Sequence, residues 1–233
     1  MIYATSDIHG WPLDDFLRLL DRAKFSDGDR LYVLGDVIDR GYGGISILLD
    51  MMSRPNVVPI LGNHELLALP TLRRMALDLP GVSPGKKFDI IEKTAEYRTW
   101  MRNDGVPTDM EFRPSTREEK RRIVDYIANF RLYAEIEVAG TKYHLSHTLP
   151  FFDPAVPIHD VPLAEFVWGD PDYATRYDPE VTFVTGHTPT ALIDPASMGR
   201  IWRGNGHIAI DCGAAFGCRL ACLCLDNGRE YYV

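Results

Sequence analysis

Three short apolar segments near the start of the chain are each followed by a polar cluster. The apolar segments cover residues 2–5, 30–34 and 56–61, and helical spacing follows the first two at 14–24 and 45–52. Strand, loop and helix in alternation predict βαβ units with parallel strands at the core. In such sheets, ligands bind beyond the carboxyl ends of the strands. We therefore expect the three polar clusters to meet at one edge of a sheet.

Residues 70–130 depart from this pattern. Prolines divide the first part into short pieces, and the Gly-Lys-Lys stretch at 85–87 resembles a turn or loop. Residues 115–118 resemble a capping box, and apolar side chains recur at helical spacing over 119–130. We interpret 70–130 as a mainly helical insertion packed beside the sheet, within a single domain that covers 1–233.

Strand-like segments return after the insertion. A second sheet that faces the first is the expected outcome. The predicted fold class is therefore α/β, with two mixed β-sheets packed as a sandwich flanked by helices. Proline-rich segments at 150–162 and 171–179 are the predicted loops most able to shape a substrate groove. The later predicted strands are 132–138, 142–146, 181–185, 207–211 and 219–225.

The composition is that of an ordinary globular protein. Of the 233 residues, 45% are hydrophobic and 25% are charged, so the chain can bury a sizeable core. The 25 basic and 33 acidic residues give a net charge of −8, which argues against a sequence-independent nucleic-acid groove. The first residues show no targeting pattern, and no apolar stretch approaches the length of a membrane span. We expect a cytoplasmic protein that binds neither nucleic acid nor membranes; its oligomeric state is not predicted.

Four cysteines gather near the end of the chain. Cys222 and Cys224 are two residues apart in an alternating segment, which places both on one face of a predicted strand. Together with Cys212 and Cys218, their spacing fits no metal-knuckle pattern. We predict buried structural thiols in preference to a zinc site or a disulfide.

Side chains able to bind a metal follow several of the predicted strands. Two alternate in the first loop, two follow a glycine that permits close backbone approach, and two end strands of the second sheet. Carboxylate, imidazole and amide ligands together suit manganese, iron or zinc better than calcium. Two metal ions bridged by one aspartate would use the whole set. The six candidates are Asp7, His9, Asp36, Asn63, His147 and His187.

The order of the motifs matters more than any single one. An Asp-x-His pair alone is weak evidence, and Gly-Asn-His-Glu can be a turn followed by a helix cap. Here Asp-x-His, Gly-Asp-x-x-Asp-Arg-Gly and Gly-Asn-His-Glu occur in that order, each after a predicted strand. Chance does not explain this co-occurrence, and we interpret the set as a metal site.

These motifs resemble those of the phosphoprotein phosphatase family, of phage lambda and bacterial type, within the calcineurin-like metallophosphoesterase superfamily. The resemblance spans residues 7 to 213, and the insertion carries none of it. It implies the four-layer metallophosphoesterase fold. The matching segments are 7–10, 35–41, 62–65, His147, 186–188 and 210–214.

The resemblance also implies a ligand set for two divalent transition-metal ions. Manganese is the expected metal, with iron or zinc as alternatives. Asp36 would bridge the two ions, and their positive charge would let an acidic protein hold an anionic substrate. The first metal would be held by Asp7, His9 and Asp36, and the second by Asp36, Asn63, His147 and His187.

The remaining implied roles concern catalysis. Arg40 and Asn63 would bind phosphate oxygens, and His64, oriented by Asp39, would be the general acid. The implied reaction is hydrolysis of phosphoserine and phosphothreonine in proteins, with phosphotyrosine as a further candidate, by direct attack of a metal-bridging hydroxide. Phosphorylated proteins or peptides would be the partners.

Two residue assignments have alternatives. His144 competes with His147 as a ligand, but it lies three residues earlier in the same strand and should point to the opposite face. Arg176, in the loop after Trp168, is the candidate for a second phosphate-binding arginine. The alternative for Arg176 is a surface ion pair with a neighbour such as Asp178.

Two other functions use the same motifs. Symmetrical hydrolysis of diadenosine tetraphosphate would need a nucleotide-sized pocket built by the insertion. A catalytically silent adaptor that binds phosphorylated partners would need neither His64 nor Asp39, so the presence of both argues for an enzyme.

Overall fold

Two five-stranded sheets form the body of the protein. The structure is a computed structural model that describes residues 1–149, 156 and 160–233. In the first sheet the order is β10-β9-β1-β2-β3, and β1, β2 and β3 are parallel, as the alternating pattern predicts. The strands are β1 (Ile2–Thr5), β2 (Arg30–Leu34), β3 (Val57–Ile60), β9 (Ala221–Cys224) and β10 (Glu230–Tyr232).

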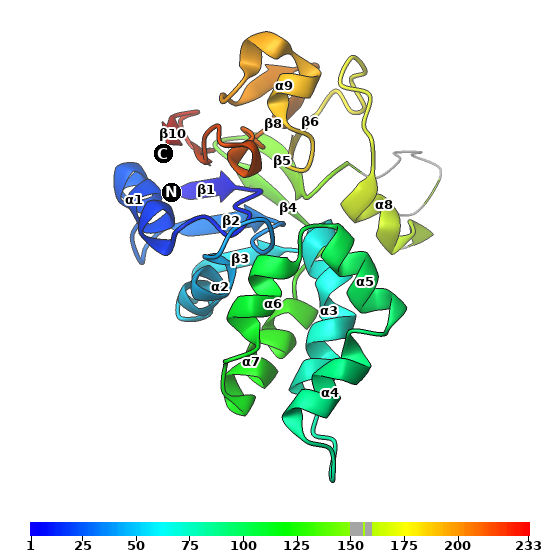
Figure 1. Ribbon diagram of the computed structural model, residues 1–233. Helices are drawn as coiled ribbons and strands as arrows, with labels where there is room; N and C mark the ends of the chain where they lie inside the picture. Colours follow the sequence, from blue (N-terminus) through cyan, green and yellow to red (C-terminus); the bar gives the residue numbers. More distant parts are fainter. Residues whose placement is uncertain (150–155, 157–159) are drawn as a thin grey trace.

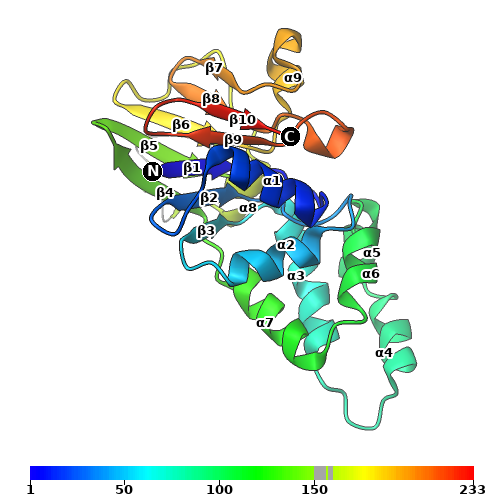
Figure 2. The ribbon, with the colours of Figure 1, turned by 90° about the vertical axis from the view of Figure 1, so that its left-hand side faces the viewer.

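The second sheet faces the first (Figures 1 and 2). Its order is β4-β5-β6-β8-β7, with β5, β6 and β8 parallel and both edge strands antiparallel. The prediction of two mixed sheets in an α/β fold is confirmed. The strands are β4 (Tyr133–Val138), β5 (Thr141–Ser146), β6 (Val181–Thr185), β7 (Trp202–Gly204) and β8 (His207–Ala209).

Apolar side chains from both sheets make one core between them. Tyr32 and Leu34 of β2 pack with Leu145 of β5 and Val184 of β6 in this layer. A second core lies on the outer face of the first sheet, where helices cover Leu31 and its neighbours. These helices are α1 (Leu13–Ala23), α2 (Gly44–Met52) and α3 (Asn63–Ala76).

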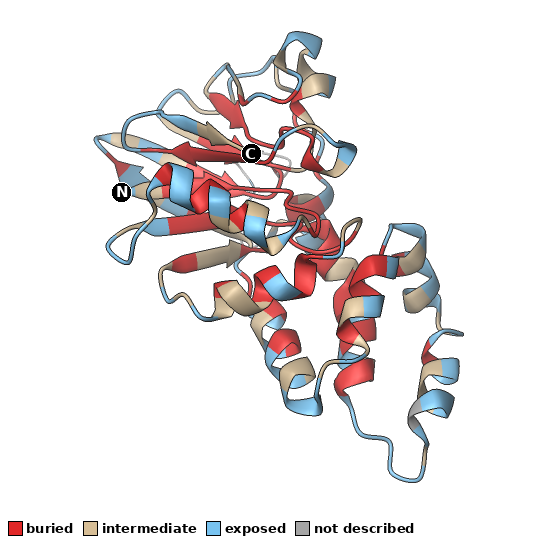
Figure 3. Ribbon diagram, turned by 60° about the vertical axis from the view of Figure 1, so that its left-hand side comes forward, coloured by how far each residue is buried: buried red, intermediate tan, exposed pale blue. Residues whose placement is uncertain are grey.

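Helices also form a lobe beside the sandwich. Four helices between residues 84 and 128 gather below the sheets in Figure 1. Helices α4, α5 and α7 pack against α3, and α6 packs against α2; α4 is mostly exposed (Figure 3). We call these four helices the helical lobe. They are α4 (Pro84–Ile91), α5 (Ala95–Arg102), α6 (Val106–Phe112) and α7 (Arg117–Ala128). Two short helices, α8 (Leu163–Trp168) and α9 (Thr190–Ile193), follow β5 and β6.

Three local expectations in this region are wrong. Helix α3 continues through Pro70 to Ala76, because burial of its apolar face outweighs the one backbone hydrogen bond that proline removes. The Gly-Lys-Lys stretch lies inside α4, where Ser83 caps the helix and Pro84 opens it. The capping box of α7 is formed one residue later than predicted, by Thr116 and Glu119.

The cysteines are free thiols. Cys212, Cys222 and Cys224 are buried, while Cys218 is half-buried. Cys222 and Cys224 share the core on the helix-covered face of the first sheet, as their alternation predicts. Among the described residues, the helices are all too short or too polar to span a membrane.

Candidate active site

The loops after β1 and β2 are joined by backbone hydrogen bonds. The amide of Asp7 donates to Gly35 O at 3.1 Å, and that of His9 donates to Asp36 O at 2.8 Å. Gly62 brings the third loop equally close, because a Cβ there would lie 2.2 Å from Asp36 Oδ1. The three polar clusters therefore meet at the carboxyl ends of the parallel strands, as predicted.

Several side chains at this edge stand on strained backbone. Their φ angles lie between 48° and 70°, in the left-handed region that costs a residue other than glycine roughly 1–2 kcal/mol. Such strain persists only where surrounding contacts hold it, and it concentrates at functional sites. The residues are Asp7, His9, Asp36, Asp39, Arg40 and His187.

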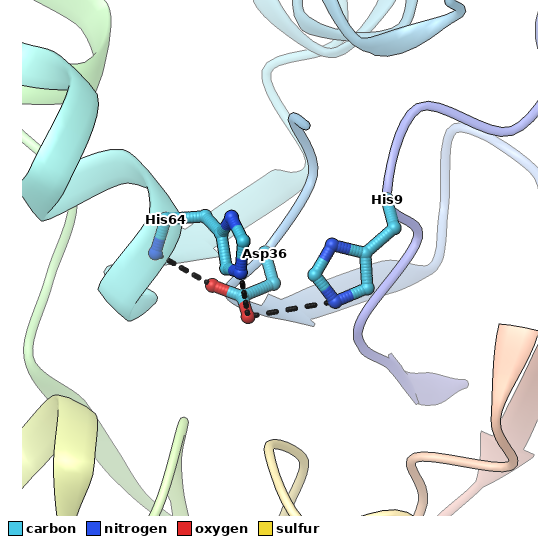
Figure 4. A group of neighbouring side chains, drawn as sticks. All are labelled: His9, Asp36 and His64. Atoms are coloured by element: carbon cyan, nitrogen blue, oxygen red, sulfur yellow. Dashed lines mark hydrogen bonds and ion pairs between the residues drawn. The ribbon is translucent and has the colours of Figure 1, made fainter. Parts of the chain in front are cut away.

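Asp36 lies at the centre of the site. His9 Nε2 is 3.6 Å from Asp36 Oδ2 and His64 Nε2 is 4.0 Å from it, so two neighbouring rings are directed at one carboxylate oxygen (Figure 4). The backbone N–H of His64 donates to Asp36 Oδ1 at 3.0 Å. Asp7 completes this side of the cluster, with Oδ1 3.9 Å from His9 Nε2.

A second group shares Asp36. His147 Nε2 is 3.6 Å from Asp36 Oδ2, 3.0 Å from Asn63 Oδ1 and 3.2 Å from His187 Nδ1. The His187 backbone N–H donates to Asp7 Oδ2 at 3.0 Å, which ties the two groups together. The structure thus brings all six sequence-predicted metal ligands to one place.

The arrangement of protons in this cluster fits divalent cations. His147 Nδ1 is 2.7 Å from the carbonyl of Leu34, which can only accept, so Nδ1 carries a proton and the lone pair of Nε2 is the one left for a metal. That lone pair faces Asn63 Oδ1 and Asp36 Oδ2, which are also acceptors. A cation between them would satisfy all three atoms at once.

The charges of the buried groups support the same fit. Burial lowers the pKa of His9 to about 3 and that of His187 to about 4, so both rings are neutral ligands near pH 7. Burial, then the neighbouring carboxylates of Asp211 and Asp36, raise the pKa of Asp7. Carboxylates crowded in this way need nearby positive charge to stay ionised together.

His64 differs from the other histidines of the cluster. Its Nδ1 is 2.8 Å from Asp39 Oδ2, a carboxylate in place of a backbone carbonyl. Burial opposes the charged ring, but Asp36 and the bond to Asp39 outweigh it and raise the pKa of His64. The site therefore separates the neutral imidazoles of His9 and His187, suited to metals, from the imidazole of His64, which holds its proton more tightly than a free histidine.

Arg40 stands beside the His64 ring. Its Nη2 is 3.4 Å from His64 Nε2, and its guanidinium lies 5.1 Å from the centroid of the Phe216 ring. With His64 protonated, both nitrogens are donors, so they bind an anion between them more readily than each other.

Arg176 is not brought to the site. Its Nη2 donates to Pro179 O at 2.8 Å, and its side chain lies against Gly206, which precedes β8. Because β8 runs parallel to β6, Gly206 lies at the end of the sheet away from His187. The exposed guanidinium of Arg176 donates a hydrogen bond within its own loop. The structure therefore gives no support to Arg176 as the second phosphate-binding arginine. His144 points away from the cluster and stacks on Tyr133, with ring centroids 5.3 Å apart.

Three residues at the site have roles that sequence patterns did not reveal. Glu65 accepts four backbone N–H groups beneath the cluster, and Asp211 is buried close enough to raise the pKa of Asp7. Trp100 of the helical lobe donates to Asp39. Asp211 lies within the matching segment 210–214, at the end of a predicted strand, but the motif alone gave it no role. Glu65 reads as an ordinary helix-capping residue, and Trp100 as an ordinary core aromatic.

Comparison with protein families gives one domain-wide match. The family model for calcineurin-like phosphoesterases matches residues 1–213. A symmetrical bis(5'-nucleosyl)-tetraphosphatase of Actinobacillus pleuropneumoniae serotype 3 is 32% identical over 106 residues, which cover 43% of this chain and 37% of that protein. The enzyme of the same name from Azotobacter vinelandii is 40% identical over 67 residues, covering 28% of this chain and 24% of that protein. The matched stretches are thus well under half the length of these relatives.

Solved structures share the fold at low sequence identity. A protein provisionally named a diadenosine tetraphosphatase superimposes with a TM-score of 0.63 at 16% identity, covering 100% of this chain and 92% of its own. A protein serine/threonine phosphatase from Saccharomyces cerevisiae gives a TM-score of 0.53 at 15% identity, covering 90% of this chain and 66% of its own. At these identities the likeness extends to the fold alone.

Proposed function

The chain belongs to the calcineurin-like phosphoesterase family, and from this premise we propose that it hydrolyses phosphate monoesters of protein side chains. Serine and threonine phosphates are the principal proposed substrates, with tyrosine phosphate as a further one. The proposed enzyme uses two divalent metal ions, with manganese as the expected metal and iron or zinc as alternatives.

One observation carries the proposal. The donors His64 Nε2 and Arg40 Nη2 lie 3.4 Å apart, and His64 Nε2 is only 4.0 Å from Asp36 Oδ2. A phosphoryl group bound at Asp36 through metal ions would thus meet two cationic donors. A site that only stored metal would not need them.

Each polar group then has a distinct task. Asp7, His9 and Asp36 would hold one ion, and Asp36 with Asn63, His147 and His187 would hold the other. When bound, such ions polarise phosphoryl oxygens and lower the pKa of a water molecule.

The chain's own side chains handle the charge and the proton. Arg40 offers a planar fork to two phosphoryl oxygens. As a water oxygen bonds to phosphorus and the bond from phosphorus to the leaving oxygen breaks, the Nε2 proton of His64 passes to the leaving oxygen, while Asp39 keeps the Nδ1 proton in place. The lost proton leaves His64 neutral, and water restores it.

The surface beside Arg40 favours a peptide substrate. A groove of about 350 Å³ runs from Arg40 between the helical lobe and Phe216. Its walls include the apolar side chains of Val106 and Pro107, and its charged groups are one guanidinium and one carboxylate, Asp104. A phosphorylated side chain brings one dianion, which suits this balance better than a chain of four phosphates.

Symmetrical hydrolysis of diadenosine tetraphosphate is the second candidate. Two observations favour it: relatives of that name match part of the chain, and the groove beside Arg40 is large enough for one nucleoside. Its walls come partly from the insertion, which is where a nucleotide pocket was expected.

A matched pair of measurements tests the proposal. Metal content is determined on protein purified without added metal, and turnover is then compared for phosphoserine, phosphothreonine and phosphotyrosine peptides and for the dinucleotide. A higher kcat/KM for a phosphopeptide supports the first candidate. A tenfold or greater preference for the dinucleotide, with ADP as product, assigns the second.

The same measurements test the alternative that the protein is a catalytically silent adaptor. Protein that holds two metal ions yet hydrolyses neither these substrates nor p-nitrophenyl phosphate between pH 5 and 9 would overturn the enzyme assignment. Phosphopeptide binding without turnover would then identify the adaptor.

A further inference from the structure

We propose that Trp100, in the helical lobe, is a positioning residue for the acid of the phosphoesterase. Its indole N–H holds the carboxylate of Asp39, which in turn orients His64. This inference rests on the proposed function, and it makes the insertion part of the catalytic apparatus.

The contact is direct and fully buried. Trp100 Nε1 lies 2.9 Å from Asp39 Oδ2 and 3.1 Å from Oδ1, so its N–H is shared between both oxygens. Asp39 Oδ2 is also the atom that accepts the Nδ1–H of His64 at 2.8 Å. Neither Trp100 nor Asp39 has any solvent-exposed surface. The Asp39 carboxylate thus links the imidazole of His64, on α3, to the indole of Trp100, on α5.

The backbone at Gly105 restricts the position of the Trp100 indole. A Cβ at Gly105 would lie 2.5 Å from Trp100 Nε1, so the absence of a side chain there allows the backbone to press against the ring. The Gly105 amide also donates to Trp100 O at 3.2 Å. Apolar packing alone would not require the indole nitrogen to face a carboxylate.

Other parts of the lobe hold the same short segment. Thr108 Oγ1 accepts the backbone N–H of Asp39 at 2.8 Å, and Asp104 O accepts that of Arg40 at 3.0 Å. Asp39 and Arg40 have φ angles of 70° and 69°, a strained pair that needs external support. The lobe therefore supports the strained backbone as well as the carboxylate.

The chemical consequence follows from the path of the proton. When the P–O bond breaks, the leaving oxygen takes the proton from His64 Nε2, and the imidazole must face that oxygen at that moment. Without the indole N–H, the Asp39 carboxylate loses the donor that is shared between its two oxygens, and the His64 ring is held less firmly in its direction. Proton transfer from His64 to the leaving oxygen becomes slower. Metal binding and the contact between Arg40 and the phosphoryl group do not depend on the indole.

Leaving-group dependence reports this defect. The p-nitrophenolate ion departs with little protonation, whereas the more basic phenolate depends more on an acid. In the metal-loaded full chain, Trp100→Phe is expected to lower kcat for phenyl phosphate about tenfold and that for p-nitrophenyl phosphate less than threefold, with KM unchanged. Equal losses on both esters would overturn the proposal.

Two controls isolate the role. Tyr97→Phe alters the same helix but removes a hydroxyl that faces Asp109, and it should leave the ratio of the two rates unchanged. In a His64→Asn background, Trp100→Phe should have no further effect on phenyl phosphate, because the acid is already absent. A further tenfold loss of kcat in the double variant would show that Trp100 has only a structural role and would contradict the proposal.

A second pair keeps the test decisive if Trp100→Phe does not fold. Trp100→Gln and Trp100→Met have similar length, but only glutamine keeps a donor nitrogen as many bonds from the backbone as the indole nitrogen. Glutamine should preserve the rate ratio better than methionine, and identical ratios would contradict the proposal. Wild-type turnover of p-nitrophenyl phosphate tests the proposed function separately: an active wild type with unresponsive variants overturns only the role of Trp100.

Discussion

The carboxylate of Glu65 accepts the backbone N–H of Asp36 at 2.9 Å. The same oxygen accepts from Gly62 N at 3.1 Å, and the other accepts from Val37 N at 2.8 Å and Ile38 N at 3.3 Å. One fully buried side chain at the start of α3 thus binds the turn that carries the central aspartate. We infer that the geometry of the proposed metal site depends on Glu65, which lies beneath the site and is not one of the proposed ligands.

We expect Glu65→Gln to weaken metal binding and to destabilise the fold. The NH₂ group of the glutamine side chain would face backbone N–H groups, to which it cannot offer an acceptor. At least one buried N–H would be left unpaired, which costs about 1–3 kcal/mol. Displacement of Asp36 should weaken metal affinity about tenfold or more. Urea unfolding of metal-free protein and calorimetric titration with manganese measure the two effects.

Glu119→Gln is the matched control, since Glu119 occupies the same helix position in the exposed capping box of α7. It should leave metal affinity unchanged. Equal metal affinity in the wild type and Glu65→Gln would contradict the proposed support of Asp36.

His64→Asn should abolish most turnover while both metal ions remain. The asparagine lacks a titratable proton, so loss of the general acid should lower kcat for phenyl phosphate about 10²–10⁴-fold. Steady-state kinetics and metal analysis of the same sample check both parts. Because His64 lies within metal-binding range of His9 and Asp36, loss of one ion in this variant would reassign it as a ligand.

Much of the site could be predicted because it follows short strands in order. Asp7, Asp36 and Asn63 each come after an apolar segment, and parallel pairing of β1, β2 and β3 brings their carboxyl ends together. His147 was separated from His144 by strand alternation, and the structure places these rings on opposite sides of β5.

The supporting residues could not be predicted, because their roles depend on long-range contacts. Trp100 contacts Asp39 across 61 positions, and helical spacing makes it resemble a core aromatic. Arg176 was assigned by its distance after Trp168, but the fold turns its loop toward Gly206. The strands β7 and β10 each have three residues, too few for periodicity to reveal.

Arg40→Lys should raise KM more than it lowers kcat. Lysine keeps the charge but loses the planar fork and its packing on Phe216, so we expect KM for a phosphorylated peptide to rise about tenfold. The Arg40 side chain is partly exposed, and thermal stability should change little. Arg176→Lys is the matched control, and an equal effect at Arg176 would show that both arginines reach the substrate.

His144→Phe should make the protein less sensitive to acid. His144 is buried between Tyr133 and Phe183; Glu135 faces its Nδ1 at 3.8 Å, and Nε2 has no hydrogen-bond partner among the described atoms. Burial lowers its pKa from 6.5 to about 4. Between those values the unfolded chain binds a proton that the folded chain rejects, so stability falls as the pH drops from 6.5 towards 4.

Phenylalanine removes this contribution and fills a similar volume between the two rings. The loss of unfolding free energy between pH 7 and pH 5 should therefore shrink by about 1–2 kcal/mol in the variant. Urea unfolding in the presence of EDTA measures it without interference from bound metal. Tyr143→Phe, on the adjacent position of β5, removes no group that titrates in this range and should match the wild type. If His144→Phe shows the wild-type pH dependence, the acid sensitivity arises from other buried groups, such as His207.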